Sequence, residues 1–193
     1  MSTKISVFIA TSLDGYIARE DGSIDWLIEA NQLARHGEDC GYKSFIATVD
    51  FMIMGRHSFE KVVSFEEWPY GQLPVLVLSS NIIDIPEHLK PFVSVSNKKP
   101  YDLYQELEAK NIRHVYLDGG ITIQQFLNAG LVDEITLTLI PILIGSGKRL
   151  FGDLEQDNQL NHISTTTYSG GFVQVKYQPN GRNSDKDKLP INI

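Results

Sequence analysis

Short apolar runs alternate with stretches of helical periodicity along the first two thirds of the chain. Strands are predicted where apolar and β-branched residues cluster between turn formers, at 5–10, 51–54, 75–78, 93–95 and 114–117. Helices are predicted between them, at 23–37, 56–62, 101–110 and 122–128. Ser23 is expected to cap the first of these helices, which should end near Gly37. This alternation is typical of a parallel sheet with crossover helices.

The last third of the chain carries β-rich runs without an intervening helix. These runs cover 134–144 and 172–177, and they predict an antiparallel pair that completes the sheet. Pro141 indicates an edge position or a bulge, because proline cannot donate a ladder hydrogen bond. We therefore expect one α/β domain over residues 1–178, with a mainly parallel central sheet, an antiparallel C-terminal edge and helices on both faces. Residues 179–193 are polar and charged and are expected to form a tail.

Composition places the chain among ordinary globular domains. Of its 193 residues, 42% are hydrophobic and 21% are charged, which suits one domain with a substantial core. The formal net charge of -7, from 17 basic and 24 acidic residues, argues against a surface built to bind nucleic acid. A small molecule is therefore the expected partner.

Cysteine usage and apolar run lengths bear on the compartment. Cys40 is the single cysteine, so an intrachain disulfide and a zinc cluster built on cysteines are excluded. No apolar run approaches the ~20 residues that a membrane span requires, and residues 1–10 are expected to form a strand rather than a signal peptide. These features lead us to expect a cytoplasmic protein without membrane contact.

Three junctions run from an apolar strand into small or polar residues. Free backbone amides at a helix start carry about half a positive charge and bind anions such as phosphate. The first junction offers Gly55, Arg56, His57 and Ser58, the second offers Ser79 and Ser80, and the third offers Asp118, Gly119, Gly120, Ile121 and Thr122. Arg56 or Lys98 could supply charge to a phosphate held by the two serines. Each junction alone is also compatible with an ordinary turn.

Several familiar chemistries lack their sequence patterns. Residues 145–149, Gly-Ser-Gly-Lys-Arg, do not have the spacing of a P-loop and are predicted to form a hairpin turn. No G-x-G-x-x-G sequence opens a helix, and no G-x-S-x-G sequence exists. The histidines are scattered rather than spaced for ligation, so we expect no metal site and disfavour a zinc-dependent deaminase on this scaffold.

Taken together and in order, six segments resemble a known family. These segments are FIATSLDGYIA at 8–18, MGRHSFE at 54–60, VLSS at 77–80, DGG at 118–120, GLVDE at 130–134 and PILIG at 141–145. They resemble the dihydrofolate-reductase superfamily, and within it the C-terminal reductase domain of the bacterial bifunctional deaminase-reductase of riboflavin biosynthesis. The resemblance spans residues 5–177 and implies a single-domain dihydrofolate-reductase-like fold that binds NADPH.

The resemblance also assigns roles to individual residues. The nicotinamide of NADPH would contact Ala10, Ile17 and Ala18. The diphosphate would be cradled by Gly55, Arg56, His57 and Ser58 and covered by Gly119, Gly120, Ile121 and Thr122. Ser79 and Ser80 would lie by the adenosine ribose, and Arg56 with Ser79 favours NADPH over NADH. The implied activity is reduction of a small heterocycle, as by 5-amino-6-(5-phosphoribosylamino)uracil reductase.

The chain departs from the folate reductases at its first helix. Those enzymes carry an acid five residues after a tryptophan, whereas Asn31 stands five residues after Trp26. Asp25 and Glu29 are the nearby carboxylates and our candidates for catalysis, with Trp26 and Asp14 as candidate substrate contacts. Two alternatives stay open: a pterin or dihydrofolate-type reductase, and a non-catalytic nucleotide-binding module on the same fold.

The apolar β run at 135–144 exceeds what one sheet face requires. Exposed apolar surface of this extent is typical of an interface, and most soluble oligomers are symmetric. We therefore expect a homodimer through this run, unless the strand is buried on both faces within one chain.

Overall fold

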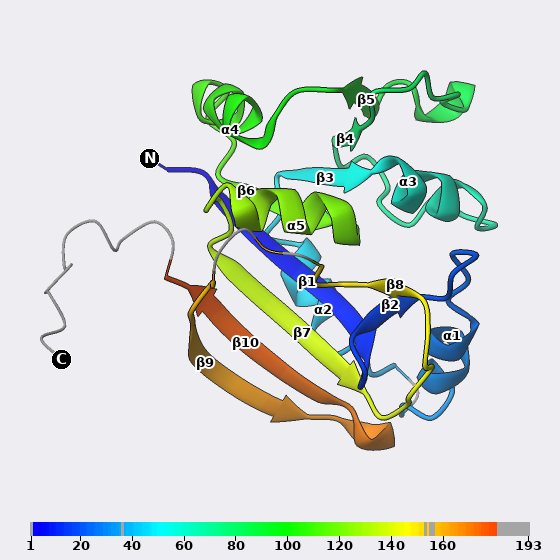
Figure 1. Ribbon diagram of the computed structural model, residues 1–193. Helices are drawn as coiled ribbons and strands as arrows, with labels where there is room; N and C mark the ends of the chain where they lie inside the picture. Colours follow the sequence, from blue (N-terminus) through cyan, green and yellow to red (C-terminus); the bar gives the residue numbers. More distant parts are fainter. Residues whose placement is uncertain (1, 36, 153, 155–156, 181–193) are drawn as a thin grey trace, which may run out of the picture.

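An eight-stranded sheet forms the centre of the molecule (Figure 1). The computed structural model describes residues 2–35, 37–152, 154 and 157–180. The strands lie in the order β5-β4-β3-β6-β1-β7-β10-β9; the first six are parallel, and β10 runs antiparallel to both of its neighbours. Their bounds are β1 Lys4–Ser12, β3 Phe51–Gly55, β4 Val75–Leu78, β5 Val93–Ser96, β6 His114–Asp118, β7 Glu134–Ile140, β9 Leu160–Thr167 and β10 Val173–Pro179. The predicted mainly parallel sheet with an antiparallel C-terminal edge is confirmed.

Helices cover both faces of this sheet, as predicted. Their bounds are α1 Asp25–Asn31, α2 Tyr42–Ile46, α3 Arg56–Val63, α4 Pro100–Ala109 and α5 Gly120–Asn128, with short 3₁₀ turns at Glu87–Leu89 and Ser169–Gly171. Buried residues of α4 and α5 pack on one face, and buried residues of α3 with partly buried residues of α2 pack on the other. In the described part of the chain, no helix is long and apolar enough to cross a membrane.

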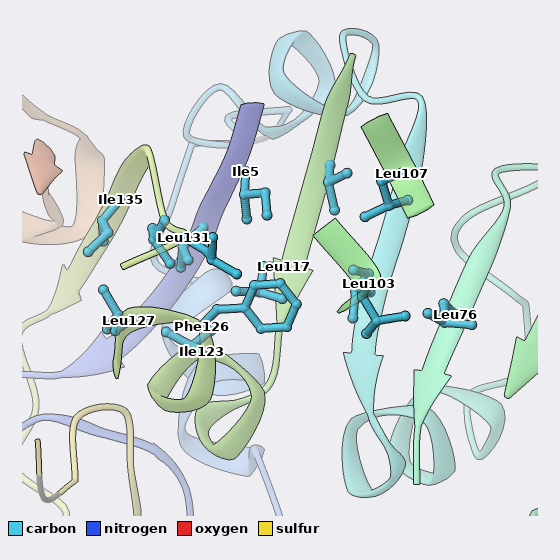
Figure 2. Close-up of a cluster of buried hydrophobic side chains, with 14 of the residues drawn as sticks. Ile5, Leu76, Leu103, Leu107, Leu117, Ile123, Phe126, Leu127, Leu131 and Ile135 are labelled. Carbon is cyan, nitrogen blue, oxygen red and sulfur yellow. The ribbon is translucent and has the colours of Figure 1, made fainter. Parts of the chain in front are cut away.

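The larger buried cluster lies between the sheet and the helices α4 and α5. Ile123 and Phe126 of α5 are fully buried there beside Leu117 of β6 (Figure 2). Ile53 of β3 joins this cluster, whereas its neighbour Met54 joins the cluster on the opposite face, because successive side chains of a strand alternate in direction. Burying a side chain such as Phe126 contributes about 1.5–3 kcal/mol. The core thus fixes β6 and α5, whose junction borders the site described below.

A second, two-stranded sheet joins β2 (Tyr16–Ala18) to β8 (Lys148–Arg149). The strands are antiparallel, so residues from the 145–149 segment lie beside the loop that follows β1. In Figure 1, β2, β8 and α1 lie together near the arrowhead of β1. This small sheet brings two distant parts of the chain to the carboxyl end of β1.

The first helix is shorter than the sequence predicts. It ends at Asn31 rather than near Gly37, and its N-cap is Ile24 rather than Ser23. Ser23 still contributes, because its Oγ accepts a hydrogen bond of 3.3 Å from the Asp25 amide. The apolar spacing that predicted a longer helix includes Leu33, but this side chain is 69% exposed.

The strand β7 ends earlier than the sequence predicts and is not an edge strand. It lies between β1 and β10, and it stops at Ile140. Pro141 follows the strand end, so it marks neither an edge position nor a bulge, and the prediction of one is wrong. The amide of Leu13 donates a 2.8 Å hydrogen bond to the Ile142 carbonyl instead, which draws the chain toward the loop after β1.

The C-terminal part of the sheet has two further consequences for the predictions. Both edges of β7 are paired within the chain and Ile135 and Ile140 are buried, so its apolar run serves the core of this molecule. The homodimer through this run therefore stays a prediction. β10 reaches Pro179, beyond the expected end at 177, and residues 181–193 of the predicted tail lie outside the described residues.

Candidate functional site

A groove of about 1270 Å³ opens at the carboxyl ends of the parallel strands. Its lining includes Ala10 of β1 and the last residues of four other strands, Gly55, Leu78, Ser96 and Asp118. Ligands of open α/β sheets bind outside the carboxyl ends of the strands. Pockets for small molecules typically measure about 300–1,000 Å³, so this groove is large enough for a dinucleotide.

The start of α3 forms one part of the groove wall. β3 ends at Gly55, which is the extended N-cap of α3, and Arg56, His57 and Ser58 make the first turn. No side chain caps the amides of this helix start. Such amides, together with the helix dipole, attract negative charge. The β3–α3 junction therefore presents an anion site to the groove.

The start of α5 reaches the same place from β6. Gly119 is the N-cap, with φ of 91°, and no side chain caps this helix start either. A Cβ on Gly119 would lie 2.6 Å from the Ser58 Oγ, and a Cβ on Gly55 would lie 2.8 Å from the Thr122 Oγ1. Two helix starts thus meet at a separation that only glycine permits, and both offer amides to one ligand.

Cations gather along the groove although the chain is acidic overall. The basic and imidazole side chains that line it are those of Arg56, His57, Lys61, Lys98, Lys99, Lys148 and Arg149. Asp118 is the one acidic residue among the described residues of the lining. Arg56 pairs with Glu60 at 2.9 Å, and Lys98 pairs with Glu106. A positive groove on a molecule of formal charge -7 selects an anionic ligand.

Asp118 lies half-buried on the groove floor. Desolvation raises the pKa of its carboxyl above 3.8, although hydrogen bonding to the Gly119 amide and the Ser58 side chain acts in the opposite direction. Tyr70 lines the groove nearby, and burial together with the Asp118 charge raises the pKa of Tyr42 to about 12. An acid with a raised pKa beside half-buried tyrosines can retain a proton, which is a feature of functional sites.

The structure brings together every residue predicted to contact the cofactor. All of them line the groove: Ala10, Ile17, Ala18, Gly55, Arg56, His57, Ser58, Ser79, Ser80, Gly119, Gly120, Ile121 and Thr122. They come from the carboxyl ends of four parallel strands and from β2. These segments are far apart in the sequence, and the order of the strands in the sheet brings them together.

The predicted catalytic and substrate residues, by contrast, do not line the groove. The Asp14 carboxylate accepts hydrogen bonds from the Ser12 hydroxyl and the Gly145 amide, at 2.6 and 2.8 Å. Asp25 pairs with Arg19 at 2.6 Å and Glu29 is exposed.

Trp26 is buried in the core beside Ala30, Ile140 and Phe172. The parts of this region that do line the groove are Ile24 and Leu27. The groove geometry thus gives no support to Asp14, Asp25, Trp26 or Glu29 as catalytic or substrate residues. Asp14 lies in the loop after β1, and the exposed or buried positions of Asp25, Trp26 and Glu29 depend on the phase of α1, which a helix of seven residues does not define in the sequence.

Several residues of the groove have no role in the sequence-based assignment. Asp118 was visible only as part of the Gly-Gly junction, and Lys61 and Lys99 lie in segments of ordinary composition. Lys148 and Arg149 belong to the segment predicted as a plain hairpin turn. No local pattern in the sequence marks these residues as a set, because they meet only once the strands are placed side by side.

A mostly parallel sheet with antiparallel C-terminal strands and a groove at the strand ends defines a protein of the dihydrofolate-reductase-like fold. The sequence matches the RibD C-terminal domain family over residues 3–174, and the chain belongs to that family.

Among related sequences, the uncharacterized protein YwjB of Bacillus subtilis is 33% identical over 180 residues, which is 92% of this chain and 98% of YwjB. The uncharacterized protein YyaP of the same organism is 28% identical over 190 residues, covering 92% of this chain and 96% of YyaP. The similarity thus extends over nearly the whole length of both relatives.

Among solved structures, a putative riboflavin biosynthesis protein from Shewanella sp. PV-4 is similar with a TM-score of 0.85 and 38% identity, over 92% of this chain and 99% of that one. The diaminohydroxyphosphoribosylaminopyrimidine deaminase/5-amino-6-(5-phosphoribosylamino)uracil reductase from Thermotoga maritima gives a TM-score of 0.70 at 12% identity, over 92% of this chain and 57% of that one. At 12% identity, the similarity to the Thermotoga maritima protein shows a shared fold alone.

Proposed function

We propose that this protein is an NADPH-dependent reductase of a small heterocyclic substrate, similar to 5-amino-6-(5-phosphoribosylamino)uracil reductase. The observation that carries the proposal is the meeting of two uncapped helix starts, at Gly55 and Gly119, on the floor of a cationic groove. The family supports a reductase-type role for the chain. The cofactor and the substrate are our inference from the groove.

The groove fits NADPH in a defined direction. The amides at the starts of α3 and α5 would bind the diphosphate. Ser79 and Ser80 lie at the carboxyl end of β4, and Lys98 and Lys99 follow β5, so these residues with Arg56 would receive the adenosine end. Their charge favours a 2′-phosphate and therefore NADPH over NADH.

The nicotinamide end would then lie toward β1 and β2. Ala10, Ile17 and Ala18 provide a small, apolar surface there, which suits close approach of a planar ring. NADPH bound in this way would supply a hydride. The protein's own contribution is to orient the ring, to exclude water and to place a proton-bearing group nearby.

Asp118, the one acidic residue among the described residues that line the groove, is our candidate to bear that proton. Leu117 pairs with Val7 in the parallel register of β6 and β1, so Asp118 lies next to the strand that carries Ala10. Desolvation raises the pKa of the Asp118 carboxyl, so the protonated form persists to a higher pH than for an exposed aspartate. A protonated carboxyl can donate a hydrogen bond or a proton to a reduced heterocycle.

The test is NADPH oxidation followed at 340 nm with a panel of pyrimidines and pterins. The proposal expects turnover with at least one compound and its loss in Gly120→Asp, because a carboxylate at the start of α5 would repel the diphosphate. The matched control is Gly130→Asp, because Gly130 lies after α5 and outside the groove. This variant should retain turnover. Tight NADPH binding without turnover of any compound would contradict the reductase assignment.

A non-catalytic nucleotide-binding module is the second candidate. The observation that favours it is the position of Asp25 and Glu29, which lie outside the groove and leave α1 without an acid in the site. NADPH binding that survives Asp118→Asn, together with an inactive wild type, would support this candidate.

A further inference from the structure

The start of α5 meets the β2–β8 sheet at one side of the groove. A Cβ on Gly120 would lie 3.0 Å from the Arg149 carbonyl oxygen and 3.0 Å from the Ile17 Cδ1. Arg149 belongs to β8 and Ile17 to β2, and all three residues line the groove. Because Gly120 carries no side chain, the helix start can approach both strands this closely. The first amides of α5 and the β2 wall are therefore immediate neighbours.

The Gln124 side chain joins the same helix to the end of β8. Gln124 lies four residues after Gly120, and residues four apart share a helix face. Its Nε2 donates a 2.9 Å hydrogen bond to the Leu150 carbonyl and makes a longer contact of 3.5 Å with the Arg149 carbonyl. Leu150 is fully buried in the larger core cluster. One side-chain amide thus holds the first turns of α5 against two successive carbonyls of a distant segment.

This contact distinguishes Gln124 from its neighbour and fixes the orientation of its amide. Carbonyl oxygens can only accept hydrogen bonds, so the NH₂ group of Gln124 must face them. Gln125 also lines the groove, but its side chain makes no hydrogen bond within the described part of the chain. The contact between α5 and β8 therefore depends on the residue at 124 and on its donor group.

Gly152 provides the space in which the Gln124 amide lies. A Cβ on Gly152 would lie 2.7 Å from the Gln124 Oε1 and 3.2 Å from its Nε2. The backbone of Gly152 is not in the left-handed region, so a side chain there would cause no backbone strain. A methyl group at 152 would instead displace the Gln124 amide from the carbonyls it contacts.

The strand β8 is in turn fixed to β2. The Leu150 amide donates a 3.0 Å hydrogen bond to the Gly15 carbonyl, and Arg149 pairs with Tyr16 in the ladder. The Arg149 guanidinium also donates to the Tyr16 hydroxyl at 3.0 Å. A continuous series of contacts therefore runs from the first turns of α5, through Gln124 and β8, to the β2 wall.

Under the proposed function, the two surfaces that Gln124 connects receive different parts of the cofactor. The amides at the start of α5 bind the diphosphate, and Ile17 and Ala18 of β2 contact the nicotinamide. One ribose joins these two parts of NADPH, so the distance between the surfaces must match its length. Hydride transfer is sensitive to this match, because a misplacement of about 1 Å can cost about a hundredfold in rate.

We propose that Gln124 is a positioning residue that sets the distance between the diphosphate amides of α5 and the nicotinamide surface of β2. The proposal rests on the proposed function, because it takes the cofactor's orientation from it. The Gln124 donor is engaged by the carbonyls of Arg149 and Leu150, so the residue acts through β8 rather than by binding NADPH itself.

Two ligands separate this positioning role from a general loss of stability. NADPH spans both surfaces, whereas 2′,5′-ADP carries the adenosine, the 2′-phosphate and a single 5′-phosphate, and has no nicotinamide. Gln124→Met keeps an unbranched side chain and removes the donor. It should weaken NADPH binding about fivefold, the loss of one hydrogen bond, and leave 2′,5′-ADP affinity within about twofold of wild type. Calorimetric titration with each ligand measures the two affinities.

Gly152→Ala tests the same contact from its other side. This variant retains Gln124 but displaces its amide, so the ratio of NADPH affinity to 2′,5′-ADP affinity should fall as it does in Gln124→Met. Gln105→Met is the matched control, because Gln105 is an exposed glutamine of α4 outside the groove. It should leave both affinities unchanged. Thermal unfolding establishes that every variant is folded at the temperature of the titrations.

The outcomes separate this proposal from the proposed function. Failure of the wild type to bind NADPH would contradict the proposed function itself. NADPH binding that is equally tight in wild type, Gln124→Met and Gly152→Ala would overturn the positioning role. Equal losses of NADPH and 2′,5′-ADP affinity in Gln124→Met would also overturn it, because the residue would then support the groove as a whole. A selective loss of NADPH affinity in both variants is the result that the proposal predicts.

Discussion

The Ser58 hydroxyl oxygen lies 2.6 Å from the point at which a Cβ on Gly119 would stand. Ser58 belongs to the first turn of α3 and Gly119 is the N-cap of α5, so this distance measures how closely two helix starts approach. The floor of the groove is built on this contact. A side chain at 119 would separate the two sets of amides that we assign to the diphosphate.

We predict that Gly119→Ala weakens NADPH binding at least tenfold and destabilises the protein by about 1–3 kcal/mol, because it adds both a clash and a strained φ. Fluorescence titration and urea unfolding measure the two effects. Gly130→Ala is the matched control: it has a positive φ of 65° but nothing within 4 Å of its Cβ. Gly130→Ala should lower the free energy of unfolding without weakening NADPH binding. Equal NADPH affinity in Gly119→Ala and Gly130→Ala would contradict the assignment of the α3 and α5 amides to the diphosphate.

Arg56 should distinguish the two nicotinamide cofactors. Arg56→Gln removes a charge-assisted contact to the 2′-phosphate, so NADPH affinity should fall about tenfold while NADH affinity changes much less. Arg113→Gln, an exposed arginine outside the groove, should change neither affinity. Calorimetry with both cofactors measures this, and parallel losses of NADPH and NADH affinity would show that Arg56 does not recognise the 2′-phosphate.

The raised pKa of Asp118 predicts a specific pH dependence of stability. Because the folded-state pKa lies above the unfolded value, protonated Asp118 stabilises the fold at low pH, and this contribution is lost as pH rises from about 3.8 through the folded pKa. Asp118→Asn lacks this titration. Its stability relative to wild type should therefore increase with pH, as measured by urea unfolding at pH 4 and pH 8. A pH-independent difference would contradict the buried-acid assignment.

His114 provides the opposite case at the other end of the sheet. Its Nε2 lies 2.9 Å from the Ser6 hydroxyl and its Nδ1 lies 3.0 Å from the Thr48 carbonyl oxygen, while desolvation lowers its pKa below 6.5. The neutral ring is favoured in the fold, so wild type should lose stability as pH falls below about 6.5 toward the folded pKa. His114→Gln should show a shallower loss between pH 7 and pH 5 in thermal unfolding, and identical slopes would refute the prediction.

Much of the fold is predictable because its signals are local. β3 ends at Gly55 and β6 is followed by Gly119, and the apolar residues of both strands are buried between helices, as such runs require. β9 carries no such signal, because most of its residues are polar and all eight are exposed. The five-residue helix α2 and the two-residue strand β8 are too short for periodicity to define them.

The candidate site likewise contains residues that the sequence marks locally and residues that it does not. Glycines and serines at strand ends mark Gly55, Gly119 and Ser79 directly in the sequence, and the sheet then assembles them. Lys148 has no local signal, because its place depends on the contact between Gly147 and Ala18, which lie far apart in the chain. The sequence could not place the carboxylates of α1 relative to the groove, because the pairing of Asp25 with Arg19 and the exposure of Glu29 are properties of the folded structure.

The central claim is that the groove at the strand ends binds NADPH. Calorimetric titration of cofactor-free protein with NADPH and with NADH, at one moderate salt concentration, tests it most directly. The account predicts micromolar affinity for NADPH and affinity at least about tenfold weaker for NADH, the difference one phosphate contact supplies. Binding of neither cofactor, or equal binding of both, would contradict it.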